Sequence, residues 1–123
     1  MKRILCVDDD QDILDIYEIV LVDQGYSVRT TIYPLDIFRL IVEFKPDLIL
    51  LDINMHRANG LEICREIKSY VANKNTPVII ISCDDSIHKA VCDFGASATI
   101  SKPFEVANFV ETVKYHLSQE INV

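Results

Sequence analysis

Charged and hydroxyl side chains directly follow three short apolar runs of the sequence and a fourth segment of mixed character. Asp8 and Asp9 follow the run 4–7, Asp52 follows 48–51, Ser82 follows 78–81 and Lys102 follows 98–101. Carboxylates brought together repel one another unless a cation lies between them, and hard oxygen ligands favour Mg2+, which suits phosphate chemistry. A carboxylate beside such an ion can attack a phosphorus atom, while the metal and a lysine ammonium neutralise the phosphoryl oxygens. If the fold brings these residues together, they indicate phosphoryl transfer to an aspartate.

The apolar runs predict strands, and the segments between them predict helices. We expect strands over 4–7, 26–30, 48–51, 78–81 and 98–101, most of them continuously apolar, as in parallel strands covered on both faces. Apolar residues at helical spacing predict helices from Gln11 to before Gly25, from Pro34 to before Pro46, from Gly60 to Val71, over 87–94 and over 106–117. The helix over 87–94 is the shortest of these.

Five strands that alternate with five helices predict an α/β fold. Right-handed crossovers place helices on each side of a parallel sheet, so we expect a doubly wound five-stranded parallel sheet with helices on both faces. In such open sheets, sites form beyond the carboxyl ends of the strands. The polar residues that follow the predicted strands lie at this edge.

Length, charge and cysteine content limit the class of protein. The 123 residues fit one domain, 1–123, and the net charge of 12 − 19 = −7 would repel phosphate backbones, so we expect no direct nucleic-acid binding by this domain. No run of about 18 apolar residues is present, and the apolar start is too short and too quickly acidic for a signal peptide, so we expect neither a membrane span nor secretion. The four cysteines form no CxxC pair and three lie in apolar segments, which predicts buried free thiols in a reducing, cytoplasmic compartment.

Three segments of the chain resemble the successive signatures of response-regulator receiver domains, the phosphoacceptor-aspartate family of two-component signal transduction. They are KRILCVDDD, PDLILLDINM and GASATISKPF, and Gly60 follows Asp52 by eight residues. The resemblance covers nearly the whole chain and implies a flavodoxin-like sheet with strand order 2-1-3-4-5. It implies a phosphorelay receiver that takes a phosphoryl group from a histidine kinase or a histidine phosphotransfer protein and switches binding to a downstream protein target. Such a domain is not an enzyme in the usual sense, although it carries self-phosphorylation and self-dephosphorylation chemistry.

The resemblance also implies a role for each site residue. Asp52 is the expected phosphoacceptor, Ser82 and Lys102 the contacts of the phosphoryl group, and Asp8, Asp9, Asp52 and Asn54 the residues around Mg2+. Within the metal set, Asp9 is the direct ligand, Asp8 acts through water and Asn54 offers its backbone carbonyl. The resemblance further implies a cis peptide bond before Pro103, and we expect Asp10 to be a helix cap rather than a ligand.

The chain departs from the family pattern at several positions. Thr99 stands where the family often has Tyr or Phe, whose inward rotation reports phosphorylation, so we expect a muted or differently routed conformational change. Asn54 and Asp84 occupy positions that tune attack by water, and their combination resembles regulators with a short-lived phosphate. His56 stands where the family usually has proline; we expect an exposed loop histidine, with an influence on loop rigidity as the alternative.

Two other functions remain open from the sequence. A phosphorylation-independent interaction module is favoured by Thr99 and His56 but opposed by the intact acidic pair, Asp52 and Lys102. A small phosphatase of the haloacid dehalogenase-like class also uses an aspartate nucleophile after a strand. The second aspartate that this class carries two residues further on is Asn54 here, which counts against it.

Overall fold

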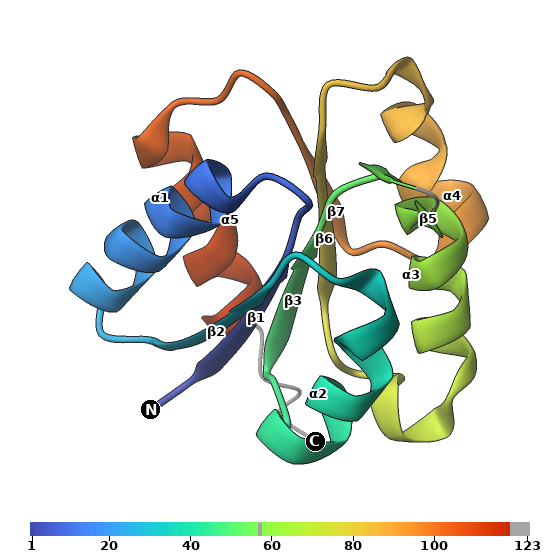
Figure 1. Cartoon of the computed structure of the whole chain (residues 1–123), viewed down its shortest axis with the longest axis horizontal. Helices are drawn as coiled ribbons and strands as arrows, with labels where there is room; N and C mark the ends of the chain where they lie inside the picture. Colours follow the sequence, from blue (N-terminus) through green and yellow to red (C-terminus); the bar gives the residue numbers. More distant parts are fainter. Residues whose placement is uncertain (57, 119–123) are drawn as a thin grey trace.

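A five-stranded parallel sheet forms the centre of the molecule (Figure 1). The computed structural model describes residues 1–56 and 58–118. The sheet has the order β2-β1-β3-β6-β7 and consists of β1 (Arg3–Val7), β2 (Ser27–Thr31), β3 (Leu48–Leu51), β6 (Val78–Ser82) and β7 (Ala98–Ser101). All four neighbouring pairs are parallel. Because β6 and β7 are the fourth and fifth strands of this sheet, the expected order 2-1-3-4-5 is confirmed.

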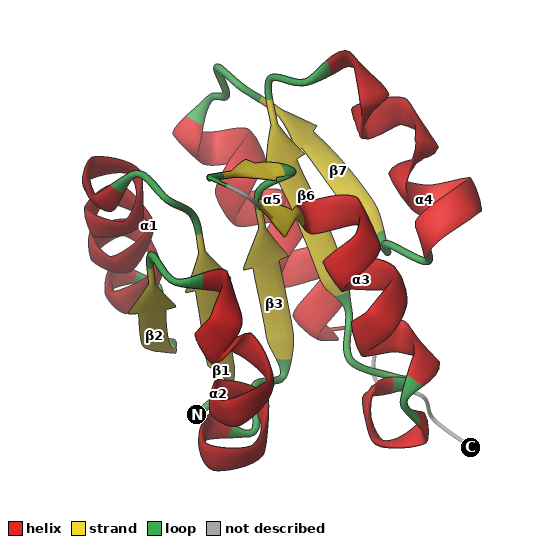
Figure 2. Cartoon of the chain, turned by 45° about the vertical axis from the view of Figure 1, so that its right-hand side comes forward, coloured by secondary structure: helices red, strands yellow, loops and turns green. Residues whose placement is uncertain are grey.

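Helices cover both faces of the sheet, as Figures 1 and 2 show. Helices α1 (Gln11–Asp23) and α5 (Val106–Ser118) lie on one face; α2 (Ile37–Phe44), α3 (Gly60–Ser69) and α4 (Ala90–Phe94) lie on the other. Successive residues of a strand point to opposite faces, so Leu5 packs under α2 and α3 while its neighbour Ile4 packs under α1 and α5. Two apolar cores result, which explains why the central strands are apolar throughout and confirms the doubly wound architecture.

Polar caps begin the two helices that flank the expected site. The side chain of Asp10 accepts hydrogen bonds from the backbone N–H groups of Asp12 and Ile13 at the start of α1, so its expected role as a cap is confirmed. Asn59 caps α3 in the same way through the N–H groups of Leu61 and Glu62. These caps satisfy donors that a helix start leaves unpaired.

Several predicted element boundaries are wrong. The second strand begins at Ser27, one residue later than expected. The helix expected from Pro34 begins with a 3-10 helix, η1 (Pro34–Asp36), and the regular helix α2 starts at Ile37. The helix expected over 87–94 is the 3-10 helix η3 (Asp85–Lys89) followed by the short α4. A short hairpin of β4 (Asn54–Met55) and β5 (Ala58–Asn59) follows β3 and was not predicted.

The third helix also ends earlier than predicted. It stops at Ser69 because Tyr70 has an extended backbone, and Val71 lies exposed in the 3-10 helix η2 (Val71–Asn73) instead of on the apolar side of α3. The ammonium of Lys68 donates to three backbone carbonyls of the following turn, those of Asn73, Lys74 and Thr76. All three donors of the lysine are thereby used, which fixes the turn that leads into β6.

The expectation of buried thiols holds for only two of the four cysteines. All four are free; Cys6 and Cys64 are buried, and burial raises the pKa of Cys64 to about 11, so this thiol stays protonated. Cys83 and Cys92 are exposed, because the first lies in the loop after β6 and the second lies on the outer side of α4. Among the described helices, none is long and apolar enough to cross a bilayer.

We predict that Gly60→Ala destabilises the protein strongly. A Cβ atom at Gly60 would lie 1.8 Å from the carbonyl oxygen of Asp52, a backbone atom that cannot move without displacing Asp52 itself. Overpacking of this kind should lower the free energy of unfolding by about 3 kcal/mol, which urea denaturation measures. The matched control is Glu66→Ala on the exposed side of α3, for which we expect a change within about 0.5 kcal/mol. Wild-type stability in Gly60→Ala would contradict the close approach.

Candidate functional site

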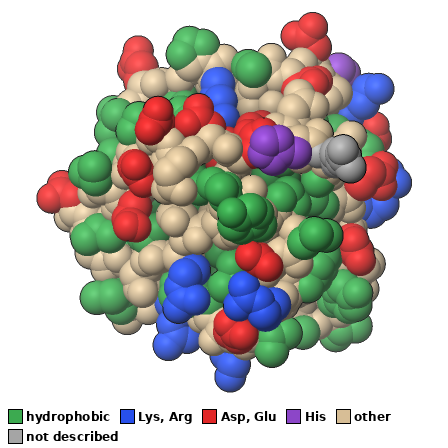
Figure 3. Space-filling view, viewed as in Figure 1, with side chains coloured by type: hydrophobic (Ala, Val, Ile, Leu, Met, Phe, Trp, Pro, Cys, Tyr) green, Lys and Arg blue, Asp and Glu red, His purple; other side chains and the backbone are tan. Residues whose placement is uncertain are grey.

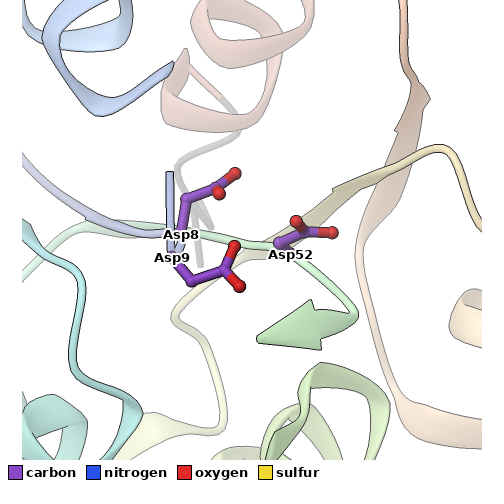
Figure 4. A group of neighbouring side chains, drawn as sticks. All are labelled: Asp8, Asp9 and Asp52. Atoms are coloured by element: carbon purple, nitrogen blue, oxygen red, sulfur yellow. The ribbon is translucent and has the colours of Figure 1, made fainter. Parts of the chain in front are cut away.

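The predicted site residues meet at the carboxyl edge of the sheet. Asp8 and Asp9 follow β1, Asp52 follows β3, Ser82 is the last residue of β6 and Lys102 follows β7. Figure 4 shows the side chains of the three aspartates next to one another. Oxygen atoms of Asp8, Asp9 and Asp52 all lie within 4.8 Å of one another. The parallel topology therefore unites residues that are up to 94 positions apart in the sequence.

The three carboxylates differ in their surroundings. Asp8 is 1% exposed, whereas Asp9 and Asp52 are partly open to solvent. Burial raises the pKa of Asp8, although hydrogen bonds from the Lys102 ammonium and from the backbone N–H of Asp10 act in the opposite direction. Asp52 is held by its own loop, since the N–H of Ile53 donates to its Oδ1 at 2.7 Å. Asp52 is thus both oriented and accessible.

Lys102 is the cation of the site. Its Nζ lies 2.8 Å from Oδ2 of Asp8 and 3.3 Å from Oδ2 of Asp52. Burial tends to lower the pKa of this ammonium, but the hydrogen bond with Asp8 and the negative charges of Asp52 and Asp8 outweigh it, so the pKa of Lys102 is raised. The peptide bond between Lys102 and Pro103 is cis, as the resemblance implies. Lys102 therefore remains charged and joins two of the three carboxylates.

The donor set fits a hard divalent cation. Three carboxylates face one ammonium, which leaves an excess of negative charge within a few ångströms. Their oxygens are the ligands that Mg2+ takes in proteins, and two of the carboxylates are partly exposed, as an ion that keeps bound water requires. The site thus has the charge and the ligand type for a metal.

A second group of polar contacts borders the site on the side of the β4–β5 hairpin. The exposed side chain of Asn54 donates from Nδ2 to Oδ2 of Asp84 at 2.7 Å. The backbone N–H of His56 donates to Oδ2 of Asp9 at 3.3 Å, and His56 has a positive φ of 50°. The histidine ring is exposed, as expected of a loop residue. The contact between its backbone amide and Asp9 was not predicted, because it depends on the backbone conformation of a hairpin that no sequence pattern indicates.

Ser82 is buried and linked to Asp84. Its Oγ accepts a hydrogen bond from the backbone N–H of Asp84 at 3.1 Å, and its carbonyl accepts one from the backbone N–H of Lys102 at 3.0 Å. The hydroxyl thus forms the local turn that serines often form, and it does so beside the acidic residues. Hydrogen bonds from the Ser86 hydroxyl and the Asn54 amide lower the pKa of Asp84 to about 2.

The chain matches one known protein family along most of its length. Residues 4–114 match the family model described as response regulator receiver domain. The receiver domain of NtrX from Brucella abortus is 31% identical, with a TM-score of 0.85, over 95% of this chain and 99% of that one. The signal receiver domain of a histidine kinase from Syntrophus aciditrophicus is 25% identical, with a TM-score of 0.90, over 100% of this chain and 95% of that one.

A third solved structure agrees with these two. It is a candidate response regulator from Chloroflexus aurantiacus, 28% identical with a TM-score of 0.89, and the match covers 96% of this chain and 98% of that one. The family match, the shared fold and the cluster of acidic residues at the carboxyl edge all agree. The chain belongs to the response regulator receiver domain family.

Proposed function

We propose that Asp52 accepts a phosphoryl group in a Mg2+-dependent reaction and thereby switches the binding of a downstream protein. The observation that carries this proposal is the position of Asp52: partly exposed, 3.3 Å from the Lys102 ammonium and beside the carboxylates of Asp8 and Asp9. A nucleophile must be open to its donor, and the charge that it receives must be neutralised; this position meets both needs.

Three aspartates and one asparagine would hold the metal ion. Asp9 and Asp52 would each offer a carboxylate oxygen, Asn54 its backbone carbonyl, and Asp8 would act through a metal-bound water. When bound, the ion supplies positive charge for the phosphoryl oxygens and holds them in place for attack. The backbone N–H of His56 donates to the Asp9 carboxylate at 3.3 Å and so restricts its orientation.

The reaction itself transfers a phosphoryl group between two protein side chains. Oδ1 of Asp52 accepts from the Ile53 N–H and Oδ2 accepts from the Lys102 ammonium, and one of these two oxygens attacks the phosphorus atom. A P–O bond forms at the attacking oxygen as the P–N bond of the donor phosphohistidine breaks, and the imidazole leaves with the bonding electron pair. Lys102 neutralises one phosphoryl oxygen and the Ser82 hydroxyl donates to another. Attack by water on the same phosphorus atom reverses the modification.

A histidine kinase or histidine phosphotransfer protein is the proposed donor, and the domain is proposed to span 1–123. NtrX, whose receiver domain resembles this chain, is a longer protein of which the match covers 27%. By this comparison, a downstream effector would read the phosphorylated state. We propose a cytoplasmic location, because the exposed thiols of Cys83 and Cys92 are free.

Direct contact of this domain with nucleic acid or membrane is not part of the proposal. The net charge is −7, which would repel phosphate backbones. On the face drawn in Figure 3, acidic side chains lie along much of the rim, and most of the Lys and Arg side chains gather near the lower edge around an acidic one. The phosphatase alternative also loses support. Its second acidic position is Asn54, whose side chain is hydrogen-bonded to Asp84.

We predict that the wild-type protein gains the mass of one phosphoryl group when it is incubated with acetyl phosphate and Mg2+. Intact-mass spectrometry measures the adduct, and it should be absent from Asp52→Asn and from a sample treated with a chelator. Far-UV circular dichroism shows that each sample is folded. A folded wild-type protein without an adduct would reject the proposal and favour the phosphorylation-independent interaction module.

We predict that Asp8→Asn stabilises the protein at pH 7 in the presence of a chelator. Burial raises the pKa of Asp8 in the folded state, so the folded chain holds a proton there more tightly than the unfolded chain does. Stability from this group is complete below its unfolded pKa of about 3.9 and is lost as the pH rises through the raised folded value. The gain in unfolding midpoint for Asp8→Asn should therefore shrink as the pH falls toward about 4.

The control for this experiment is Glu111→Gln, which removes one negative charge from the exposed side of α5. It should show no comparable gain. Addition of Mg2+ should raise the midpoint of the wild type by more than that of Asp8→Asn, because the ion relieves the repulsion that the substitution has already removed. If Asp8→Asn is less stable than the wild type at pH 7, the contact with Lys102 outweighs the cost of burial and this account of Asp8 is wrong.

A further inference from the structure

Asp84 joins three parts of the molecule through its backbone N–H and its carboxylate. Its own N–H donates to Oγ of Ser82 at the end of β6, 3.1 Å away. Its Oδ2 accepts from the side chain of Asn54 on β4 at 2.7 Å. Its Oδ1 accepts from both the backbone N–H and the hydroxyl of Ser86, at 2.8 and 2.6 Å, and so caps η3. A displacement of this one residue would therefore affect the hairpin and the start of η3 together.

The segment that Asp84 caps is weakly held at its beginning. No residue of η3 is buried, and Ala90 is the one buried residue of α4. The far end of the segment is fixed by Arg65 of α3, which donates to the carbonyl of Asp93 at 3.3 Å and lies 4.3 Å from the centre of the Phe94 ring. Ile87 of η3 packs against the apolar core but is only partly buried, so the hydrogen bonds of Asp84 make a large share of what orders residues 85–89.

The neighbouring strand offers no comparable connection. Thr99 in the middle of β7 is exposed. Its side chain is short and carries no ring that could enter or leave a cavity beside Ser82. In the described part of the chain, hydrogen bonds lead from the Ser82 hydroxyl to the surface through Asp84. The backbone N–H of Asp84 contacts Ser82, and its carboxylate contacts Ser86.

We propose that Asp84 is the positioning residue that transmits the phosphorylation state of Asp52 to η3 and α4, an inference that rests on the function proposed above. When the Ser82 side chain rotates so that its hydroxyl donates to a phosphoryl oxygen, Oγ moves away from the N–H of Asp84, which then loses its acceptor. An unpaired N–H is costly, so the backbone of Asp84 shifts to find another partner. This shift withdraws the carboxylate from Asn54 and Ser86 and loosens the start of η3.

Amide hydrogen exchange of residues 85–94 tests this proposal, with and without beryllofluoride and Mg2+ as a stable phosphoryl mimic. In the wild type, the mimic should speed exchange in this segment roughly fivefold, the effect of losing one net hydrogen bond. In Asp84→Ala the segment should exchange fast in both states, so the response to the mimic is lost. Asp84→Asn, which keeps an oxygen to cap Ser86 and an amide that can pair with Asn54, should restore it.

Two further variants separate this role from simple capping. Asn54→Ala removes the contact across the site but keeps the cap on Ser86, and it should reduce the response to the mimic. Asp85→Asn removes the same charge from the adjacent exposed position and should respond fully. If Asp84 were only a cap, Asn54→Ala would keep the full response to the mimic.

The outcomes also separate this inference from the proposed function. Binding of the mimic is measured by its fluorine resonance, and acyl phosphate formation by intact mass. If the wild type binds the mimic but residues 85–94 exchange at the same rate, the inference is overturned while the phosphoacceptor function stands. A full response in Asp84→Ala would overturn it as well. If neither the mimic nor a phosphoryl group binds, the function itself fails.

Discussion

The acidic edge of the sheet depends on the ion pairs that the Lys102 ammonium forms with Asp8 and Asp52. Three carboxylates lie within 4.8 Å of one another, and one of them, Asp8, is almost fully buried. Without a cation such a cluster would be strongly repulsive. Lys102, at 2.8 Å from Asp8 and 3.3 Å from Asp52, compensates part of this charge. The remaining excess of negative charge favours a divalent ion, so the same repulsion that weakens the fold would drive metal binding.

Most of the fold follows from physical regularities that the sequence displays. Strands buried on both faces must be apolar throughout, so β1, β3 and β6 stand out, and the residues that end them are the polar ones that form the site. In the sequence, Gly60 stands out for its spacing from Asp52 and as the start of a predicted helix. The structure supplies the reason, since any side chain there would meet the carbonyl of Asp52.

The parts that could not be predicted depend on contacts between distant segments. The hairpin of β4 and β5 has two residues in each strand, too few for any periodicity. The contact between Asn54 and Asp84 spans 30 residues and joins two loops, and nothing in either loop indicates the other. The exposed thiol of Cys92 was predicted to be buried, because a short apolar run does not reveal which side of a helix faces solvent.

We propose that Asp52 is the residue that carries the phosphoryl group. Treatment of the phosphorylated protein with borohydride reduces an acyl phosphate to the alcohol and converts the modified aspartate into homoserine, which peptide mapping by mass spectrometry can locate. We predict homoserine at position 52 and at no other carboxylate. Conversion of Asp8 or Asp9 with Asp52 intact would contradict the account, because the nucleophile would then lie on the wrong strand.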